Sequence, residues 1–142
     1  MRLPSEAEWE YACRAGTTTA FHSMPGYPNG TNDDNQAGTI AWYYYNSGNQ
    51  THVVGGKAAN ALGLYDMSGN VYEWVNDWYD DGSYYSVSPS TNPLGPVSGS
   101  SRVWRGGSFQ PYYSTFVRSS SRYALGPGNT RSYVGFRVAR NP

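Results

Sequence analysis

The sequence has little of the chemistry that many enzymes and nucleic-acid-binding proteins require. Its 142 residues include one cysteine, Cys13, which excludes an intrachain disulfide bond and a cysteine-rich zinc site. Charged residues make up 14% of the chain and the formal net charge is zero, so no long-range field attracts nucleic acid or an anionic membrane. No hydrophobic run approaches the length of a membrane span, and residues 1–4 lack the apolar region of a signal peptide. We therefore expect neither a nucleic-acid partner nor membrane insertion.

Glycine, proline and aromatic residues are plentiful instead. Seventeen Gly and nine Pro are spread along the chain, which predicts many turns and little regular secondary structure. Fourteen Tyr, five Trp and four Phe supply the apolar surface that disordered chains lack. A length of 142 residues is typical of one domain with one hydrophobic core. We therefore expect a single folded domain over residues 1–142, of an irregular α+β class with few helices.

Residues 4–16 carry both the start and the stop signals of a helix. Ser5 and Glu8 have the spacing of a capping box, and Gly16 suits a left-handed residue after the last turn. Glu10 and Arg14 are placed to form an ion pair one turn apart. The residues that share the apolar face are Trp9, Ala12 and Cys13. This pattern predicts an amphipathic helix of about three turns.

Short apolar runs separated by turn residues predict the strands of a small sheet. These runs lie at residues 62–65, 71–75, 102–105 and 134–138. The aromatic segment 40–45 fits either a short strand or a packed turn, and its periodicity does not decide between them. Residues 17–35 and 80–101 are rich in turn-forming residues, so we expect a long loop in each.

Four motifs, taken in order, resemble the formylglycine-generating-enzyme (sulfatase-modifying-factor) family. They are RLPSEAEWEYA at 2–12, NALGLYDMSGNVYEW at 60–74, RGGSF at 105–109 and GFR at 135–137. The resemblance spans nearly the whole chain and implies an irregular variant of the C-type-lectin-like fold, with short antiparallel strands and long loops. A full domain of this family carries a long segment ahead of the first motif. The resemblance therefore implies an N-terminally truncated or minimal domain.

The turn at residues 66–73 is a candidate calcium site. Two carboxylates flank a Gly-Asn turn there, and Ca²⁺ takes several oxygen ligands from carboxylates and carbonyls. In the resembled family this loop binds calcium, and its ligands correspond to the Asp66 side chain, the Gly69 carbonyl, the Val71 carbonyl and the Glu73 side chain. The alternative is that Asp66 caps a turn and Glu73 pairs with Arg105 or Arg137. The resemblance favours a structural Ca²⁺ ion; a second family site, near residues 35–49, has no assignable ligands.

We do not expect catalysis of the family's kind. Its oxidases bind copper with two cysteines after the Gly-Gly-Ser motif, and those positions correspond to Pro111 and Phe116, which offer no thiolate. Cys13 lies on the expected helix, where a small buried hydrophobe is the better interpretation. A related iron-dependent branch needs clustered imidazole or carboxylate ligands, and we expect His22 and His52 to be ordinary surface histidines. The chain is therefore predicted not to be an enzyme.

Residues 108–133 are rich in Tyr, Ser, Asn and Gly, which antibody paratopes use for recognition. In proteins with the C-type-lectin-like fold this region forms the enzyme pocket or, in retroelement-diversified relatives, a variable ligand-binding surface. The candidate binding residues are Gln110, Tyr112, Tyr113, Ser114, Phe116, Tyr123, Asn129, Arg131 and Tyr133. The alternative is that the tyrosines pack a small sheet through their rings and direct their hydroxyls to water.

Three functions are compatible with these observations. The first is a non-catalytic, calcium-stabilised module that binds a protein or a small ligand. The second is a structural subunit that self-associates into an extracellular oligomer or filament, because uncovered strands and apolar patches favour association. The third, an oxidase of the formylglycine-generating type, is disfavoured by the absent cysteines. One lysine stands beside nine arginines, with many Tyr, Ser, Asn, Thr and Gly, a balance that we associate with secreted proteins, so we expect an extracellular or cell-surface location.

Overall fold

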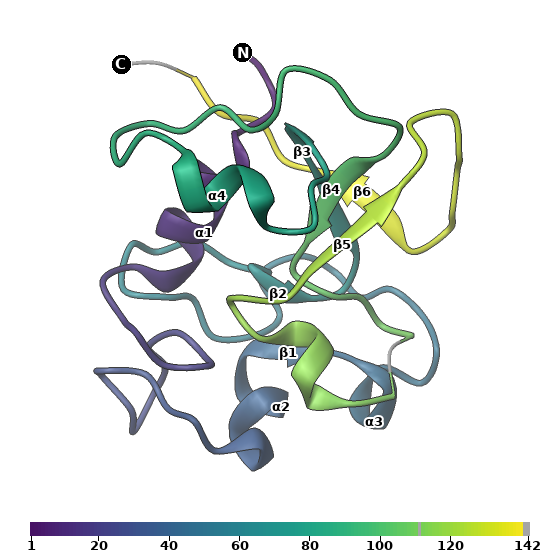
Figure 1. Cartoon of the computed structure of the whole chain (residues 1–142). Coiled ribbons are helices and arrows are strands. Elements are labelled where there is room, and N and C mark those ends of the chain that lie inside the picture. Colours follow the sequence, from purple (N-terminus) through teal and green to yellow (C-terminus); the bar gives the residue numbers. More distant parts are fainter. Residues whose placement is uncertain (111, 141–142) are drawn as a thin grey trace.

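The computed structural model describes residues 1–110 and 112–140 as two small sheets and several short helices, joined by long loops (Figure 1). In chain order the elements are α1 (Glu6–Arg14), η1 (Asp34–Gln36), α2 (Ala37–Ile40), β1 (Ala41–Trp42), α3 (Tyr44–Ser47), β2 (Ser68–Gly69), β3 (Tyr72–Trp78), α4 (Ser83–Val87), β4 (Arg102–Arg105), η2 (Ser114–Val117), β5 (Arg122–Leu125) and β6 (Val134–Phe136). None of the described helices is long and apolar enough to cross a membrane. The irregular α+β architecture agrees with the expected fold class.

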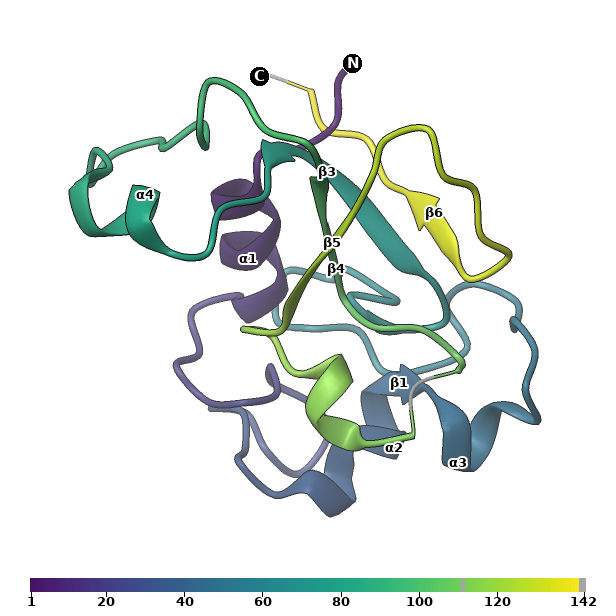
Figure 2. The same ribbon diagram turned by 45° about the vertical axis from the view of Figure 1, so that its right-hand side comes forward.

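The larger sheet has four strands in the order β5-β4-β3-β6 (Figure 2). Strand β4 pairs antiparallel with β3 and with β5, whereas β6 runs parallel to β3. The chain reaches β6 by crossing from one edge of the sheet to the other, so no tight hairpin imposes an antiparallel direction on this strand. The smaller sheet joins β1 and β2 in parallel. The expected antiparallel pairing therefore holds for β3-β4-β5, and the β3-β6 and β1-β2 pairs are parallel.

Helix α1 packs against the larger sheet through the face that the sequence predicts. The Glu8 amide donates to the Ser5 hydroxyl, and the Ser5 amide donates to the Glu8 carboxylate, which confirms the capping box. The helix ends in two left-handed residues, Ala15 and the expected Gly16, with φ values of 48° and 90°. The core between helix and sheet comprises Trp9, Cys13, Met67, Val75 and Val103.

A second core lies around α2, β1 and η2. It comprises Phe21, Met24, Ala37, Ile40, Ala41, Tyr43 and Val117. The short β1-β2 pairing beside it depends on Gly69, because a Cβ atom at this position would lie 2.4 Å from the Trp42 carbonyl oxygen. Glycine also adopts the φ of 76° found there without steric cost. This close approach fixes the chain immediately before β3, where the 66–73 turn lies.

The structure corrects several local predictions. Residues 62–65 form a turn rather than a strand, because the Asn60 side chain accepts hydrogen bonds from the Leu62 and Leu64 amides and closes the chain there. Residues 40–45 contain both alternatives, a two-residue strand followed by the start of α3. The long 80–101 segment includes α4. Strand β5 has the sequence RYAL, which is not an apolar run, and the sequence pattern does not predict it.

Candidate functional site

The 66–73 turn borders a cavity of about 520 Å³, which we call the turn cavity. The residues predicted as calcium ligands, Asp66, Gly69, Val71 and Glu73, all line it. They converge because Gly69 and Asn70 have left-handed φ values of 76° and 64°, which reverse the chain between β2 and β3. The structure therefore brings the predicted ligand residues together around one space.

The Glu73 carboxylate is buried and already has two partners. Trp9 Nε1 donates to its Oε2 at 2.6 Å. The Arg137 guanidinium donates to both carboxylate oxygens, at 2.5 and 2.6 Å. Of the two arginines considered for this ion pair, the structure selects Arg137, because Arg105 pairs with α1 instead. Glu73 therefore forms the arginine ion pair that was considered as the alternative to calcium binding, and it does so within the turn cavity.

Asp66 is less completely paired. Its Oδ2 accepts a hydrogen bond from the Gly55 amide at 2.7 Å. Its Oδ1 is buried and has no hydrogen-bond partner among the described residues. A buried carboxylate oxygen without a donor is unfavourable, and a bound cation would compensate it. This oxygen is therefore the atom of the turn that best fits a metal ligand.

The donor atoms around the turn cavity fit Ca²⁺ better than a transition metal. No group of three or more His, Cys, Asp or Glu side chains within residues 1–110 and 112–140 is placed to hold a metal ion. An ion here would take the Asp66 and Glu73 carboxylates together with the Gly69 and Val71 carbonyl oxygens, which are the ligand types of Ca²⁺. Because Glu73 also pairs with Arg137, the ion would share that carboxylate with a guanidinium.

A second feature is a continuous series of aromatic ring contacts that extends from α3 across β5, β4 and β3. We call this set the aromatic face, and neighbouring ring centroids in it lie 4.4 to 6.4 Å apart. It comprises Tyr44, Tyr45, Tyr72, Trp74, Trp104, Tyr112, Tyr113, Phe116, Tyr123 and Tyr133. Tyr72 is its buried centre, and burial raises the pKa of this phenol. Ring packing of this kind stabilises the sheet whether or not a ligand binds.

The structure separates the predicted binding residues into two groups. Five of them belong to the aromatic face: Tyr112, Tyr113, Phe116, Tyr123 and Tyr133. Gln110 is exposed and Ser114 half-buried, close in the chain to the first of these tyrosines. Asn129 and Arg131 are exposed in the loop between β5 and β6, at the far end of β5 from η2 (Figure 2). Within the aromatic face, Tyr72 contacts both Tyr123 and Tyr133.

The sequence reasoning missed five residues of the aromatic face: Tyr72, Trp74 and Trp104 of the sheet, together with the pair Tyr44 and Tyr45. Both are exposed on α3 and both contact Tyr112, at centroid distances of 4.4 and 5.5 Å. The aromatic density of residues 40–45 is visible in the sequence. Its proximity to Tyr112 is not, because the two segments meet only through the tertiary fold.

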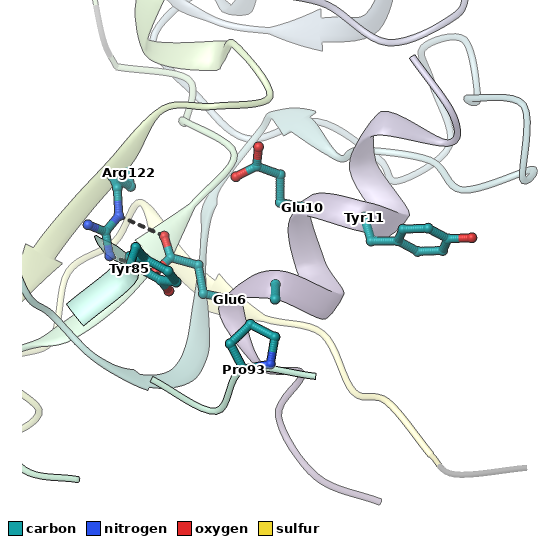
Figure 3. Close-up of a pocket in the computed structure, with 7 residues that line it drawn as sticks. Glu6, Glu10, Tyr11, Tyr85, Pro93 and Arg122 are labelled. Atoms are coloured by element: carbon teal, nitrogen blue, oxygen red, sulfur yellow. Dashed lines mark hydrogen bonds and ion pairs between the residues drawn. The ribbon is translucent and has the colours of Figure 1, made fainter. Parts of the chain in front are cut away.

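A third feature is a group of charged side chains at a cavity of about 370 Å³ beside α1 (Figure 3). Arg122 donates to both oxygens of Glu6, at 2.9 and 2.7 Å, and the Tyr85 hydroxyl donates to Glu6 at 2.8 Å. In Figure 3 these three side chains converge on one side of α1, while Tyr11 extends from the other. Both Glu6 carboxylate oxygens therefore accept hydrogen bonds from within the protein, and these bonds connect α1 to β5 and α4.

Asp77 and Arg105 extend these contacts into the interior. Asp77 Oδ2 accepts from the Glu6 amide at 2.7 Å, its Oδ1 has no partner among the described residues, and burial raises its pKa to about 6. Arg105 is fully buried and donates to Glu10 and to the carbonyl oxygens of residues 119–121. We call Glu6, Glu10, Asp77, Arg105 and Arg122 the buried charge network. It holds α1 on the sheet.

The positions that correspond to the family's catalytic cysteines offer no thiol. Pro111 lies outside the described residues. Phe116 belongs to η2, and its ring stacks between Tyr113 and Tyr123. Cys13 is fully buried, as predicted, and burial raises its thiol pKa to about 11. Phe116 and Cys13 therefore both contribute to packing.

Neither histidine is an ordinary surface residue, which corrects the prediction. His22 is buried, its Nδ1 lies 2.8 Å from the Ser23 carbonyl oxygen, and burial lowers its pKa. His52 is half-buried and stacks on Trp42 with ring centroids 3.8 Å apart, while its Nε2 lies 2.8 Å from the Ser47 carbonyl oxygen. Both histidines lie in loop-like sequence, and distant segments of the fold bury them.

Comparison with known proteins gives matches along the whole chain. Serine/threonine-protein kinase pkn1 of Chlamydia caviae is 40% identical over 141 residues, which are 98% of this chain and 21% of that protein. The formylglycine-generating enzyme of Thermomonospora curvata is 35% identical over 150 residues, which cover 99% of this chain and 50% of that enzyme. This chain thus spans half or less of the length of these relatives.

Solved structures show the same fold. Treponema denticola variable protein 1 superposes with a TM-score of 0.79 and 39% identity, over 95% of this chain and 45% of that one. PvdO from Pseudomonas aeruginosa superposes with a TM-score of 0.74 and 31% identity, over 95% of this chain and 50% of that one. The family described as the sulfatase-modifying factor enzyme 1-like (FGE-sulfatase) domain matches residues 1–142. The chain therefore belongs to the FGE-sulfatase domain family.

Proposed function

We propose that this domain is a non-catalytic, calcium-stabilised module that binds a protein or a small ligand through its aromatic face. The observation that carries the proposal is the continuity of this face, in which exposed tyrosines such as Tyr112 and Tyr113 present rings and hydroxyls to solvent. Tyrosine offers rigid contact area and a polar group at a low cost in conformational entropy, so binding surfaces are enriched in it. Gln110, Asn129 and Arg131 add exposed hydrogen-bonding groups.

The activity named for the formylglycine-generating relatives is not part of this proposal. Such chemistry needs two thiolates near the Gly-Gly-Ser motif, and this chain has Pro111 and Phe116 at the corresponding positions. The buried thiol of Cys13, with its pKa near 11, stays protonated at neutral pH. The proposal therefore assigns the domain a recognition role rather than an oxidase role.

A bound Ca²⁺ ion would be structural in this proposal. It would be held by Asp66, Gly69, Val71 and Glu73, and would supply the counter-charge that Asp66 Oδ1 lacks. Calcium often orders loops that hydrophobic burial alone does not fix, and this fold is rich in loops. The ion would thereby hold the turn that precedes β3, the strand that carries Tyr72 and Trp74 of the aromatic face.

Calcium is expected to raise the thermal unfolding midpoint of the protein relative to a sample with excess EGTA. At a calcium concentration of about 100 times Kd, binding to the folded state alone adds about 2.7 kcal/mol, or about 5–10 °C for a domain of this size. Asp66→Gly removes the carboxylate but keeps the left-handed backbone, whose φ is 55° in the wild type, and should abolish the calcium-dependent increment. Differential scanning calorimetry measures both effects.

The matched control is Asp81→Asn, which removes an exposed carboxylate that does not line the turn cavity and should leave the calcium increment unchanged. Two results would argue against the site: a wild-type midpoint that does not respond to calcium, and an increment that survives in Asp66→Gly. Either result would leave the proposed role of the aromatic face to be judged by a binding measurement.

Binding through the aromatic face is expected to be saturable and sensitive to Tyr113. We expect the monomer to bind at least one member of an array of immobilised glycans and cell-surface proteins. Tyr113→Ser should weaken that binding at least about tenfold, because a central aromatic contact commonly contributes more than 1 kcal/mol. Tyr11→Ser, which changes an exposed tyrosine of α1 outside the face, should not. Equal affinity of Tyr113→Ser and wild type would contradict the assignment.

Self-association is the second candidate function, and one observation favours it. Val54, Tyr65 and Phe136 line the turn cavity and are largely exposed, so they offer an apolar surface to another copy. Light scattering on the calorimetry samples distinguishes the two functions, because a structural subunit assembles and a binding module stays monomeric. Under both functions we propose an extracellular or cell-surface location, on the composition given above.

A further inference from the structure

Four tyrosines form an exposed group where α3 meets the segment before η2. This tyrosine cluster consists of Tyr44, Tyr45, Tyr112 and Tyr113, whose exposed fractions are 45, 63, 51 and 61%. Tyr112 contacts all of the others, with ring centroids 4.4 Å from Tyr44, 5.5 Å from Tyr45 and 5.4 Å from Tyr113. Residues far apart in the sequence therefore hold their phenol rings in direct contact at the surface.

This arrangement combines two conditions that phenol coupling requires. Each ring is open to a small diffusing oxidant, because about half or more of each side chain is exposed. A radical formed on Tyr112 is also in van der Waals contact with a second phenol, so it meets a coupling partner without diffusion. The contact between Tyr112 and Tyr44 is tilted by 39°, and side-chain rotation alone can bring their ring edges together.

We propose that the tyrosine cluster is an oxidative modification site, at which Tyr112 forms a dityrosine bond with a tyrosine of α3, Tyr44 being the nearer. The oxidant is a peroxidase-type one-electron oxidant that uses hydrogen peroxide. Each phenol loses one electron and the proton of its O–H bond, and the two radicals join through a carbon–carbon bond between ring positions next to the hydroxyls. The two ring hydrogens at that bond move to the oxygens and restore both phenols. The peroxide takes up two electrons and two protons and becomes two water molecules.

The bond would connect α3 covalently to the chain that precedes η2. A cross-link between residues distant in sequence stabilises a protein mainly by restricting its unfolded chain. The modification would therefore rigidify the part of the aromatic face that is close to Gln110 in the chain. Cross-linking at this cluster requires only the ring contacts and the exposure of the tyrosines, and neither bound calcium nor a bound ligand.

The test oxidises the dilute monomer with hydrogen peroxide and a haem peroxidase, and then maps tryptic peptides by mass spectrometry. Cleavage after lysine and arginine places Tyr44 and Tyr45 in peptide 15–57, and Tyr112 and Tyr113 in peptide 106–118. We expect a covalent pair of these two peptides that has lost two hydrogen atoms. Dityrosine fluorescence should appear in the monomer fraction.

Two phenylalanine variants make the result specific. Tyr112→Phe removes one hydroxyl from an exposed ring and should lower the yield of the linked peptides at least fivefold. Tyr11→Phe changes a more exposed tyrosine, with an exposed fraction of 77%, and should leave the yield unchanged. The proposal is overturned if no linked pair forms, if cross-links form only between molecules, or if Tyr112→Phe gives the wild-type yield. Equal thermal midpoints before oxidation would verify that both variants fold.

Discussion

Replacing Arg105 with methionine is expected to lower the free energy of unfolding by about 3–5 kcal/mol, because it removes one partner from a set of buried ion pairs. The guanidinium is fully buried and donates to Glu10 and to the carbonyl oxygens of residues 119–121. Its Nε lies 3.6 Å from Glu6 Oε1. Methionine fills similar space but donates no hydrogen bond, so the carbonyl oxygens and part of the carboxylate charge lose their partner. Urea unfolding at neutral pH measures the loss.

Arg14→Met is the matched control, because Arg14 pairs with the same Glu10 from the partly exposed side of α1, at 2.8 Å. A solvent-accessible pair one helical turn apart contributes less than about 1 kcal/mol, and the hydrogen bond from Arg14 to the Thr19 carbonyl oxygen contributes about 1 kcal/mol, so this variant should be clearly less destabilised than Arg105→Met. If Arg105→Met costs no more than Arg14→Met, then the buried charge network does not hold α1 on the sheet in the way its geometry indicates.

Replacing Asp77 with asparagine is expected to remove a pH-dependent destabilisation of the native state. Burial raises the pKa of Asp77 from its usual 3.8 to about 6. The hydrogen bond from the Glu6 amide opposes this rise, the charge of the Glu6 carboxylate adds to it, and Arg122 and Arg102 oppose it. The native state binds this proton more tightly than the unfolded state does. The contribution of the Asp77 carboxyl group to stability is therefore fully present below the unfolded-state pKa. It is lost as the pH rises through the native pKa of about 6.

The measurable quantity is the difference in unfolding free energy between Asp77→Asn and wild type. This difference should increase in favour of the variant by on the order of 2–3 kcal/mol between about pH 4 and pH 7, because the amide stays neutral throughout. The change with pH is more informative than the absolute value, since the amide can still accept a hydrogen bond from the Glu6 amide. A difference that stays constant over this range would show that the buried carboxylate titrates normally.

Asp80→Asn is a control of opposite sign. Hydrogen bonds from the Tyr84 amide, and then from the Gly82 amide and the Ser83 side chain, lower the pKa of Asp80. Its contribution is therefore present above the unfolded pKa and is lost as the pH falls through the native one. The free energy of unfolding of Asp80→Asn should therefore decrease relative to that of the wild type as the pH rises. Opposite slopes from two neighbouring aspartates would exclude a general effect of charge removal.

Several local parts of the fold were predictable, although residues 62–65 form a turn rather than the expected strand and β5 was not expected. Ser5 and Glu8 form the expected capping box, and strand β4 has the expected bounds. The predicted ligand residues of the 66–73 turn share one cavity, because a reversal within eight residues leaves few other arrangements. Each of these features depends on hydrogen bonds or backbone angles between residues close in the chain, so the residue pattern is sufficient.

Contacts between distant segments could not be derived in the same way. Arg105 and Arg137 were both candidates to form an ion pair with the Glu73 carboxylate. The parallel pairing of β6 with β3 places Arg137, which follows β6, beside Glu73. Likewise, two loop histidines became buried, and Tyr44 and Tyr45 met Tyr112 across the fold. Local patterns do not encode these pairings, because many partners of the same chemical type compete for each position.

The sequence by itself determined the family, the helix α1, the strands β3 and β4 and the residues of the candidate calcium turn. Only the tertiary structure decided which arginine neutralises Glu73, where Arg105 is buried and which tyrosines form one surface. The physical reason is that motifs, capping signals and turns act over a few residues. Ion pairs and ring contacts in this protein form instead between segments that are brought together only when the two cores pack.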